Sequence, residues 1–535
     1  MENNHPDDVN TEAYRLTRRR LLAGFGGIVA MGTVGASSAI GSTAGASTLE
    51  KAFARAAATS SGNLIIDVQT EPQGYNPLQY PNASSVWISG QIMDGLYWYD
   101  DSGNFSPLLA ASAPTTADGA TWNIKLKQGV TFHNGDTFDS SHVVATLLAT
   151  AKAPNNVYGG QLGTINSATA VDPYTVTFTL AAPNYLIPDV LATVPMCHKG
   201  HLGAETAIIG TGPFMWQSYT QGSNLVLAAN PNYHLGAPPL ANVTFQFVPA
   251  ADSRVVDALT GVSSISLLPP FNDLASIKAD KNLTLIDSPS VVMLPLHVNV
   301  QSPAFSDVRV RQALGFAMDR TRVRDIVFAG KADIFHGGVV PPTLSGFDTK
   351  NQFFPAKQNL KKAKALLKAA GKRHVEFTAV VYAVPNAIAA MTVIQQDIAK
   401  AGFVCNIEVL PLAAWAAVLT SHKFDMCVSY EFNGTWWAKD GLNPLTNYTS
   451  GLFTNWVNYN NPAFDQLLAR SRATSDRNKQ VALWKRANQM LTVAAVNLIP
   501  VVPHLTGAMS TKVHGLPTAP MRLDYLHLHN VSLSS

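Results

Sequence analysis

The segment that begins at Tyr430 reads YEFNGTWWAKDG and gathers side chains that could hold an organic solute. Two tryptophans, a tyrosine and two carboxylates lie in it: Tyr430, Glu431, Trp436, Trp437 and Asp440. Trp456 follows in a second loop. Aromatic faces beside carboxylates favour a polar, partly cationic ligand, because stacking and cation–π attraction act together there. The pattern predicts a cleft lined by these side chains; a core formed by the same rings between two lobes is the alternative.

Catalytic chemistry is not indicated by the motifs in the sequence. There is no His-Glu-x-x-His zinc motif, no Gly-x-x-x-x-Gly-Lys phosphate loop and no Gly-x-Ser-x-Gly elbow. A secreted hydrolase that uses Glu431 and Asp440 as a carboxylate pair stays open as an alternative of a different class. His133 and His142 are the candidates for nickel or metal-complex binding, but His133 lies in a strand-turn segment that a fold would use anyway. We therefore expect neither an enzyme nor a cofactor or metal.

Three cysteines, Cys197, Cys405 and Cys427, allow at most one disulfide within the chain. Cys405 and Cys427 lie in two strand-like segments that could be neighbours in one sheet, so a bond between them stays open. Buried free thiols are favoured, because a large exported domain does not need a covalent staple. Thiols in such apolar surroundings are also poor nucleophiles.

The length and charge of the chain restrict its architecture and its partners. A chain of 535 residues exceeds the size at which one hydrophobic core keeps growing, so two or three lobes are expected. Its 38 basic and 35 acidic side chains nearly balance, and no basic cluster carries interleaved aromatic residues. We therefore expect no nucleic acid partner.

The N-terminal residues have the order of an export signal. The basic motif TRRRLL begins at Thr17 and precedes a weakly apolar run over residues 23–40 and small residues up to Ala46. This order predicts a twin-arginine-type signal peptide over residues 1–46, cleaved after Ala46 or at a site up to Ala58, and a flexible leader over 47–61. Glycines in the apolar run disfavour the alternative of a membrane anchor. We expect a soluble protein in the periplasmic space or the cell envelope.

The hydrophobic pattern changes between the two halves of the chain. The first half alternates with period two, which predicts strands over residues 63–68, 121–126, 174–180, 224–229 and 242–248, and a helix over 140–151. The second half predicts helices over 359–370, 387–401, 461–474 and 476–493, and one from Asp307 capped by Ser306. Strands are expected between them over 375–382, 403–410, 424–430 and 498–502. The fold class is therefore mixed α/β.

Three long motifs carry a resemblance to a known family. They read TWNIKLKQGVTFHNGDTF from Thr121, GTGPFMWQSYTQGSNLVLAANPNYH from Gly210 and FSDVRVRQALGFAMDR from Phe305. In this order the chain resembles extracellular solute-binding family five of the ABC importers, which includes oligopeptide, dipeptide and nickel binders. The resemblance covers residues 62–535.

The resemblance implies a bilobal periplasmic-binding-protein-like fold with mixed sheets and a hinge. Lobe I would combine residues 62–87, 204–290 and 503–535, an inserted subdomain would span 88–203, and lobe II would span 291–502. A ligand between the lobes would favour their closure by contacting both. The implied function is non-enzymatic: a monomer captures a peptide-like solute and delivers it to the permease subunits of an ABC importer.

The resemblance also implies where the ligand binds. In peptide-binding members two backbone segments pair with the ligand like added strands, and here they correspond to Asn82, Ala83 and Ser84 and to Trp436–Ala438, which includes Trp437. An aspartate that holds the amino terminus of the peptide is matched most nearly by Asp440. This chain reads DGLNP from Asp440 where those members read Asp-x-x-Asp-Pro. An oligosaccharide or another small solute, stacked on the twin tryptophans beside Asn433, therefore stays an alternative.

Overall fold

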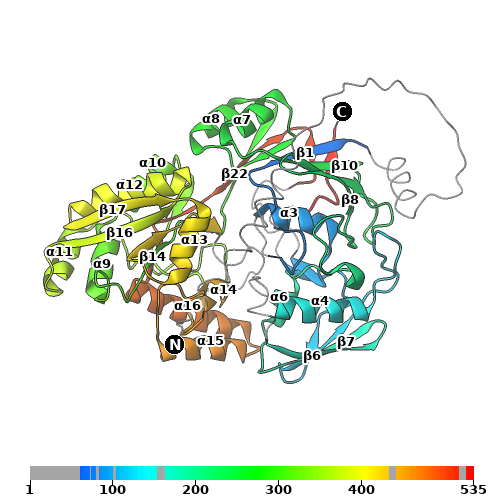
Figure 1. The fold of residues 1–535 in the computed structure, drawn as a ribbon, viewed down its shortest axis with the longest axis horizontal. Helices are drawn as coiled ribbons and strands as arrows, with labels where there is room; N and C mark the ends of the chain where they lie inside the picture. The colour runs from blue at the N-terminus through cyan, green and yellow to red at the C-terminus, as the bar shows by residue number, and fades with distance from the viewer. Residues whose placement is uncertain are drawn as a thin grey trace, which may run out of the picture. The chain divides into compact units, whose positions relative to one another are not determined.

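The computed structural model describes residues 61–72, 74–79, 83–99, 104–153, 162, 164–432, 442–452, 454–516 and 526–534. The expected signal peptide and nearly all of the expected leader, residues 1–60, lie outside the described residues. Within the described part, no helix has the length and apolar character needed to cross a membrane. Residues from Ser47 onward form one unit, and three larger sheets organise it (Figure 1).

A seven-stranded sheet collects strands from the beginning, the middle and the end of the chain, in the order β12-β22-β11-β1-β10-β9-β8. β1 runs parallel to both β10 and β11 at the centre of the sheet. The helices α3, α7 and α8 belong to the same module, and a core cluster of buried side chains from β1, β9 and β10 fills it. The bounds are β1 Asn63–Val68, α3 Ala83–Ile92, β8 Phe214–Thr220, β9 Asn224–Ala229, β10 Asn242–Phe247, α7 Ala251–Thr260, β11 Ile265–Leu267, α8 Leu274–Ala279, β12 Leu283–Ser288 and β22 Leu505–Ser510.

A four-stranded antiparallel sheet, in the order β4-β5-β7-β6, forms the four-stranded module with α4. The alternation in TWNIK works as expected, because Trp122 and Ile124 are buried while Asn123 and Lys125 are exposed. Short elements surround the sheet. The bounds are β2 Tyr97–Tyr99, β3 Phe105–Pro107, β4 Thr115–Thr116, β5 Thr121–Lys125, α4 Ser140–Lys152, β6 Ile165–Asp172, β7 Thr175–Leu180, α6 Ile187–Leu191 and a 3₁₀ turn Lys199–His201.

A five-stranded sheet, in the order β17-β16-β18-β14-β20, is the centre of the five-stranded module. Side chains of α9, α10, α11 and α12 form a large core with one face of the sheet, and α13 packs on the other face. The bounds are β14 Leu296–Val298, α9 Val308–Ala317, α10 Arg320–Val327, α11 Leu360–Ala369, β16 Val375–Tyr382, α12 Pro385–Ala399, β17 Phe403–Leu410, α13 Leu412–Ser421, β18 Met426–Val428 and β20 Asn497–Leu498.

The same module contains a second core built on helices. α15 and α16 pack against each other and against α14, with Phe464, Leu468 and Trp484 buried among them. Two small antiparallel sheets, β13 with β19 and β15 with β21, lie beside this core, and β23 pairs with β24 near the C-terminus. The bounds are β13 Val292–Met293, β15 Ala332–Ile334, β19 Glu431–Phe432, α14 Leu442–Thr446, α15 Pro462–Arg472, α16 Arg477–Ala494, β21 Val501–Pro503, β23 Val513–His514 and β24 Ser532–Leu533.

Helix starts follow local capping chemistry, with one correction to the sequence-based expectation. The side chain of Asp307, not that of Ser306, accepts a hydrogen bond from the Arg309 N–H and caps α9. Asn461 and Asp476 cap α15 and α16 in the same way. A carboxylate or amide oxygen at this position satisfies backbone N–H groups that a helix leaves unpaired.

Two strand expectations near the C-terminal side of the chain are corrected. The expected strand 498–502 is two strands, β20 and β21, which belong to different sheets. Pro500 lies between them, and proline lacks the N–H that a continuous ladder needs. The expected strand 424–430 is regular only over β18, and a second short strand, β19, follows it.

The cysteines are free and buried. β16 lies between β17 and β18, so Cys405 and Cys427 are not on neighbouring strands. Their side chains also belong to different cores, Cys405 to the large core and Cys427 to the layer under α13. The favoured expectation of free thiols is therefore confirmed for this pair.

Candidate functional site

The start of the predicted ligand loop is anchored at the end of β18. The Tyr430 ring is half-buried and stacks on Phe328, with ring centroids 6.2 Å apart and planes 13° from parallel. Burial raises the pKa of Tyr430, so its hydroxyl is neutral. Glu431 and Phe432 then form β19, which pairs with Val292 and Met293 of β13. The loop thus begins on a backbone ladder, whereas residues 433–441, with Trp436, Trp437, Ala438 and Asp440, lie outside the described residues.

Trp456 lies under α13. Its ring is half-buried and packs on the small core of Val380, Trp415, Leu419, Phe424 and Cys427. It also meets His297 edge to face, with centroids 5.4 Å apart. The indole Nε1 is buried and makes no hydrogen bond with a described residue. Trp456 therefore contributes at least part of its surface to packing within the five-stranded module.

Ala83 and Ser84 form the first turn of α3. Ser84 is buried, and its hydroxyl lies 3.3 Å from that of Thr70, just after β1. The backbone of both residues is helical. Asn82, the third residue of this predicted segment, lies outside the described residues.

The chain crosses between the seven-stranded and the five-stranded modules at two places that lie against each other. One crossing runs from β12 to β13 and the other from β21 to β22. The Ser290 hydroxyl donates a hydrogen bond to the Pro503 carbonyl at 2.6 Å and accepts one from the Val292 N–H at 2.9 Å. This paired crossing, here called the hinge junction, fixes two strands to each other where a bilobal protein must bend. The sequence analysis did not identify it, because Ser290 is an ordinary serine in sequence.

A charged cluster surrounds the hinge junction. Asp287 on β12 accepts hydrogen bonds from the Lys331 ammonium and from His504 Nδ1, which is 2.7 Å away. His504 Nε2 is 3.7 Å from the Asp333 carboxylate. The nearby Asp333 carboxylate and the hydrogen bond to Asp287 raise the pKa of His504, although partial burial opposes this. Burial alone would raise the pKa of Asp287, but hydrogen bonds from Lys331 and His504 lower it overall.

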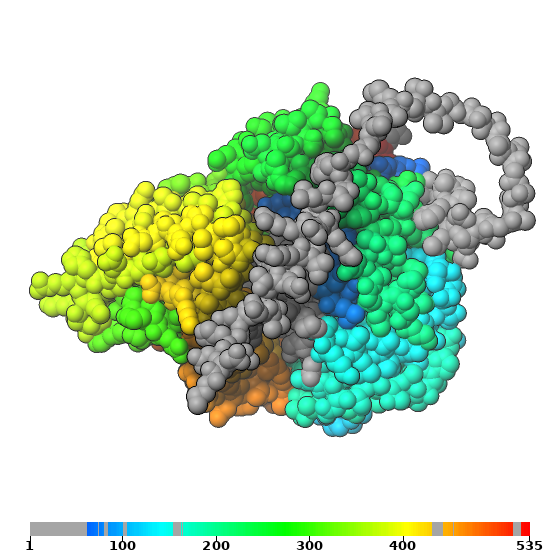
Figure 2. Space-filling model, in the orientation of Figure 1, coloured from blue at the N-terminus to red at the C-terminus, as the bar shows by residue number. Residues whose placement is uncertain are grey.

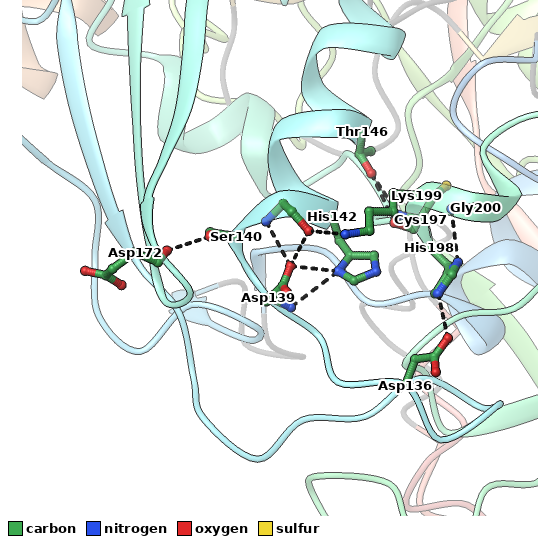
Figure 3. A network of polar contacts seen from close by, with 11 residues as sticks. Asp136, Asp139, Ser140, His142, Thr146, Asp172, Cys197, His198, Lys199 and Gly200 are labelled. Atoms are coloured by element: carbon green, nitrogen blue, oxygen red, sulfur yellow. Dashed lines mark hydrogen bonds and ion pairs between the residues drawn. The ribbon is translucent and has the colours of Figure 1, made fainter.

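The two histidines considered as metal ligands have structural roles, and Figure 3 shows the contacts of His142. His133 Nε2 lies 3.0 Å from the Gly212 carbonyl and Nδ1 accepts the Gly210 N–H, so both ring nitrogens contact backbone. Burial lowers the pKa of His133 to about 4, so the ring is neutral. His142 belongs to the capping box of α4, with Nδ1 3.0 Å from the Asp139 carboxylate. Among the described residues, no three metal-binding side chains lie close enough together to hold a metal ion.

Two cavities lie outside these junctions. An open groove of about 620 Å³ lies on the five-stranded sheet between β16 and the end of α13, with Glu408, Lys423 and Asp425 among its lining residues. A cavity of about 30 Å³ surrounds Asp94, whose carboxylate contacts Thr211, Tyr233 and His234 at 3.0–3.2 Å. The small cavity lies where the seven-stranded and the four-stranded modules meet, because its lining includes Met93 of one core and Tyr97 of the other. Neither cavity is lined by the residues predicted to hold the ligand.

Comparison with protein families decides the class of this protein. The model of the bacterial extracellular solute-binding proteins, family 5 Middle, matches residues 104–452. The chain belongs to this family. The glutathione-binding protein GsiB of Escherichia coli O6:K15:H31 is 26% identical over 473 residues, which cover 85% of this chain and 91% of GsiB.

Solved structures agree with the fold. AgaA from A. tumefacien R10, in complex with agropinic acid, superposes with a TM-score of 0.77 at 23% identity and covers 89% of this chain and 99% of AgaA. DppA from Helicobacter pylori, in complex with the peptide STSA, gives 0.77 at 21% identity over 89% of this chain and 99% of DppA. The bilobal periplasmic-binding-protein fold, predicted from the motifs, is therefore confirmed.

Family membership also confirms the predicted class of function. The protein binds a solute for an ABC importer, and it is a transport protein and not an enzyme. The hydrolase alternative, which relied on Glu431 and Asp440, is therefore set aside.

Proposed function

We propose that this protein captures a peptide-like ligand between its two lobes outside the cytoplasmic membrane and presents it to the permease subunits of an ABC importer. The observation that carries the proposal is the match to GsiB, a glutathione-binding protein, over 85% of this chain. Glutathione is itself a peptide-like molecule with a free amine and carboxylates. The peptide complex of DppA is compatible with the proposal, although that likeness supports the fold alone.

The proposed lobes follow the boundaries expected from the sequence. Lobe I combines residues 62–87, 204–290 and 503–535 around the seven-stranded sheet, with residues 88–203 inserted as the four-stranded module, and lobe II is 291–502. Two observations support this division: the seven-stranded and the four-stranded sheets have separate cores, and the chain crosses to the five-stranded module at Ser290 and Pro503.

The proposed ligand contacts come from both lobes. Lobe I contributes Asn82, Ala83 and Ser84, and lobe II contributes Tyr430, Glu431, Trp436, Trp437, Ala438, Asp440 and Trp456. Asp440 binds the ligand amine as a charge-assisted hydrogen-bond acceptor. The tryptophans stack on the ligand. Pairing of β19 with β13 supports this arrangement, because it ties the first residues of the loop to the hinge junction.

Native mass spectrometry of the mature protein purified from its host tests the ligand class. A bound mass series spaced by amino-acid residues, or the mass of glutathione, is expected. Hexose spacing or a single non-peptide mass would overturn the peptide assignment and assign the tryptophans to another solute.

Titration calorimetry with glutathione and with di- to pentapeptides then tests the amine contact. Asp440→Asn should weaken binding about ten- to a hundred-fold, because a hydrogen bond to a charged group contributes about 1.5–3 kcal/mol. Glu205→Gln, which neutralises an exposed carboxylate elsewhere, is the matched control. Equal affinities for the two variants would remove Asp440 from the site.

We propose that a twin-arginine-type signal peptide over residues 1–46 directs export across the cytoplasmic membrane. Cleavage then releases a soluble monomer that binds no nucleic acid. Replacing Arg18 and Arg19 with lysine should retain the uncleaved precursor in the cytoplasm. Mass spectrometry of the exported N-terminus gives the cleavage site, expected after Ala46. Normal export of the double-lysine variant would show that the signal is of another type.

A further inference from the structure

The segment Asn184–Asp189 of the four-stranded module contacts the five-stranded module. The Tyr185 N–H donates a hydrogen bond to the Arg472 carbonyl at the end of α15, at 2.8 Å. Asp189 accepts a hydrogen bond from Arg477 Nη1 at the start of α16, at 3.0 Å. Figure 1 shows α6, which contains Asp189, next to α15 and α16 and away from β22, and the surfaces of the two regions adjoin in Figure 2.

Leu186 carries the apolar part of this contact. Its side chain is 3% exposed and belongs to the helical core that includes Phe464, Leu467 and Trp484. Every other described member of that core lies at Val291 or later in the chain. Leu186 is thus a side chain of one module that fills a place in the core of another.

Contacts within the four-stranded module fix the conformation of the segment Asn184–Asp189. The Asn184 N–H donates to the Gly119 carbonyl at 2.8 Å, and Asn184 Oδ1 accepts the Leu186 N–H at 3.1 Å. The Tyr185 ring turns back onto Trp122, with centroids 6.3 Å apart. A Cβ at Gly119 would come within 2.6 Å of this ring, so only glycine leaves room for it. Tyr185 is therefore held inward while Leu186 is left to project outward.

Arg477, the partner of Asp189, is also held by residues of its own module. Arg477 Nη1 bonds to Gln480 Oε1 at 3.3 Å, and its guanidinium lies over the Trp484 ring at 4.9 Å. On the other side, the Tyr99 hydroxyl donates to Asp189. Each charged partner is thus held by a neighbour on its own module, which reduces the entropy lost when the two meet.

We propose that Asn184–Asp189 and the Arg472–Trp484 surface form a latch that favours the closed arrangement of the lobes without any ligand contact. Opening about the hinge junction would expose Leu186 and separate Asp189 from Arg477, so the latch stabilises the closed state alone. The fraction of closed protein sets the apparent affinity of a site that binds in that state. The inference rests on the proposed function in one respect, namely that the solute is held between the lobes.

Small-angle X-ray scattering of the ligand-free mature protein tests the latch without knowledge of the ligand. Wild-type protein should fit the structure described above, in which the latch is formed, whereas Leu186→Ala combined with Arg477→Ala should have a larger radius of gyration. Hydrogen exchange of the Tyr185 amide should become at least ten-fold faster in the variant. Val171→Ala with Lys479→Ala is the matched control, because both residues are exposed and Lys479 pairs with Asp476 of its own cap.

An unchanged radius of gyration together with an unchanged Tyr185 exchange rate would overturn the latch. If the double variant does not fold, Arg477→Glu replaces it, since that residue is partly exposed and the change places like charges together. A peptide that fails to bind any variant would count against the proposed ligand but would leave the scattering result intact, so the two failures are distinguishable.

Discussion

The hinge junction and the latch both connect the five-stranded module to the rest of the unit, but the chain crosses only at the first. At the hinge junction Ser290 binds Pro503, charged groups surround Asp287, and Phe271, from the segment between β11 and α8, meets Phe328 within the large core at 5.1 Å. At the latch, the contacts seen among the described residues are Leu186 in the helical core, a backbone hydrogen bond and an ion pair. The hinge junction must stay intact while the lobes move, whereas the latch must separate.

This difference predicts the largest effect on stability at Phe328. Phe328→Ala removes a fully buried ring that contacts Phe271 and Tyr430, and should lower the free energy of unfolding by about 3–5 kcal/mol. Because Phe271 and Phe328 belong to one core beside the chain crossings, we expect that opening does not relieve the cavity. Urea unfolding followed by circular dichroism measures the loss. A loss below 1 kcal/mol would show that the shared core is not a fixed joint.

Leu186→Ala should cost less, although Leu186 is almost as buried. Truncation of a buried leucine in a permanent core lowers the free energy of unfolding by about 2–5 kcal/mol. Here the variant can open instead, and no cavity is then left. The loss in unfolding free energy is therefore limited to the free energy by which the ligand-free protein prefers closure. The same urea experiment checks this order of effects. A cost equal to that of Phe328→Ala would make the contact permanent and contradict a releasable latch.

Most helices and strands and the family could be predicted from the sequence, but the hinge junction and the latch could not. The strands over 63–68, 224–229, 375–382 and 403–410 have the expected bounds because their alternation and flanking turns are local signals. The crossing at Ser290 and the place of Leu186 depend on residues more than 200 positions apart in the chain, for which one sequence has no pattern. The sequence predicted the aromatic loop as part of a candidate site, of which Asn82, Trp436, Trp437, Ala438 and Asp440 lie outside the described residues.

The hinge junction should also respond to pH through His504. Its pKa is raised in the folded protein, so its contribution to stability is complete below the unfolded value of about 6.5 and is lost as the pH rises through the folded value. Asp287 has a lowered pKa, so its contribution is complete above about 4 and is lost as the pH falls further. Both act together in mildly acidic solution.

His504→Gln should therefore lower the unfolding free energy by about 1 kcal/mol at pH 5.5, because a hydrogen bond to a charged group is lost, and by less at pH 9. Asp333, which faces the same ring, and Lys331, which pairs with Asp287, remain in the variant. Urea unfolding of both proteins at the two pH values gives the comparison. A difference that grows with pH would reverse the assigned sign and remove His504 from the charged cluster.

The smallest effect is expected for the ion pair of the latch. Arg477 is about two-fifths exposed, and partly exposed pairs contribute only about 0.2–1 kcal/mol. Arg477→Ala should therefore barely change the unfolding free energy, but it should make closure insensitive to salt, because added ions screen the wild-type pair. Scattering of ligand-free protein at 0.05 M and 0.5 M sodium chloride tests this, with Lys479→Ala as the control. The ion pair shifts the balance between open and closed protein if wild type and Arg477→Ala are equally open in high salt and only wild type closes in low salt. If Arg477→Ala keeps the salt response, that response comes from the charged cluster at the hinge junction instead.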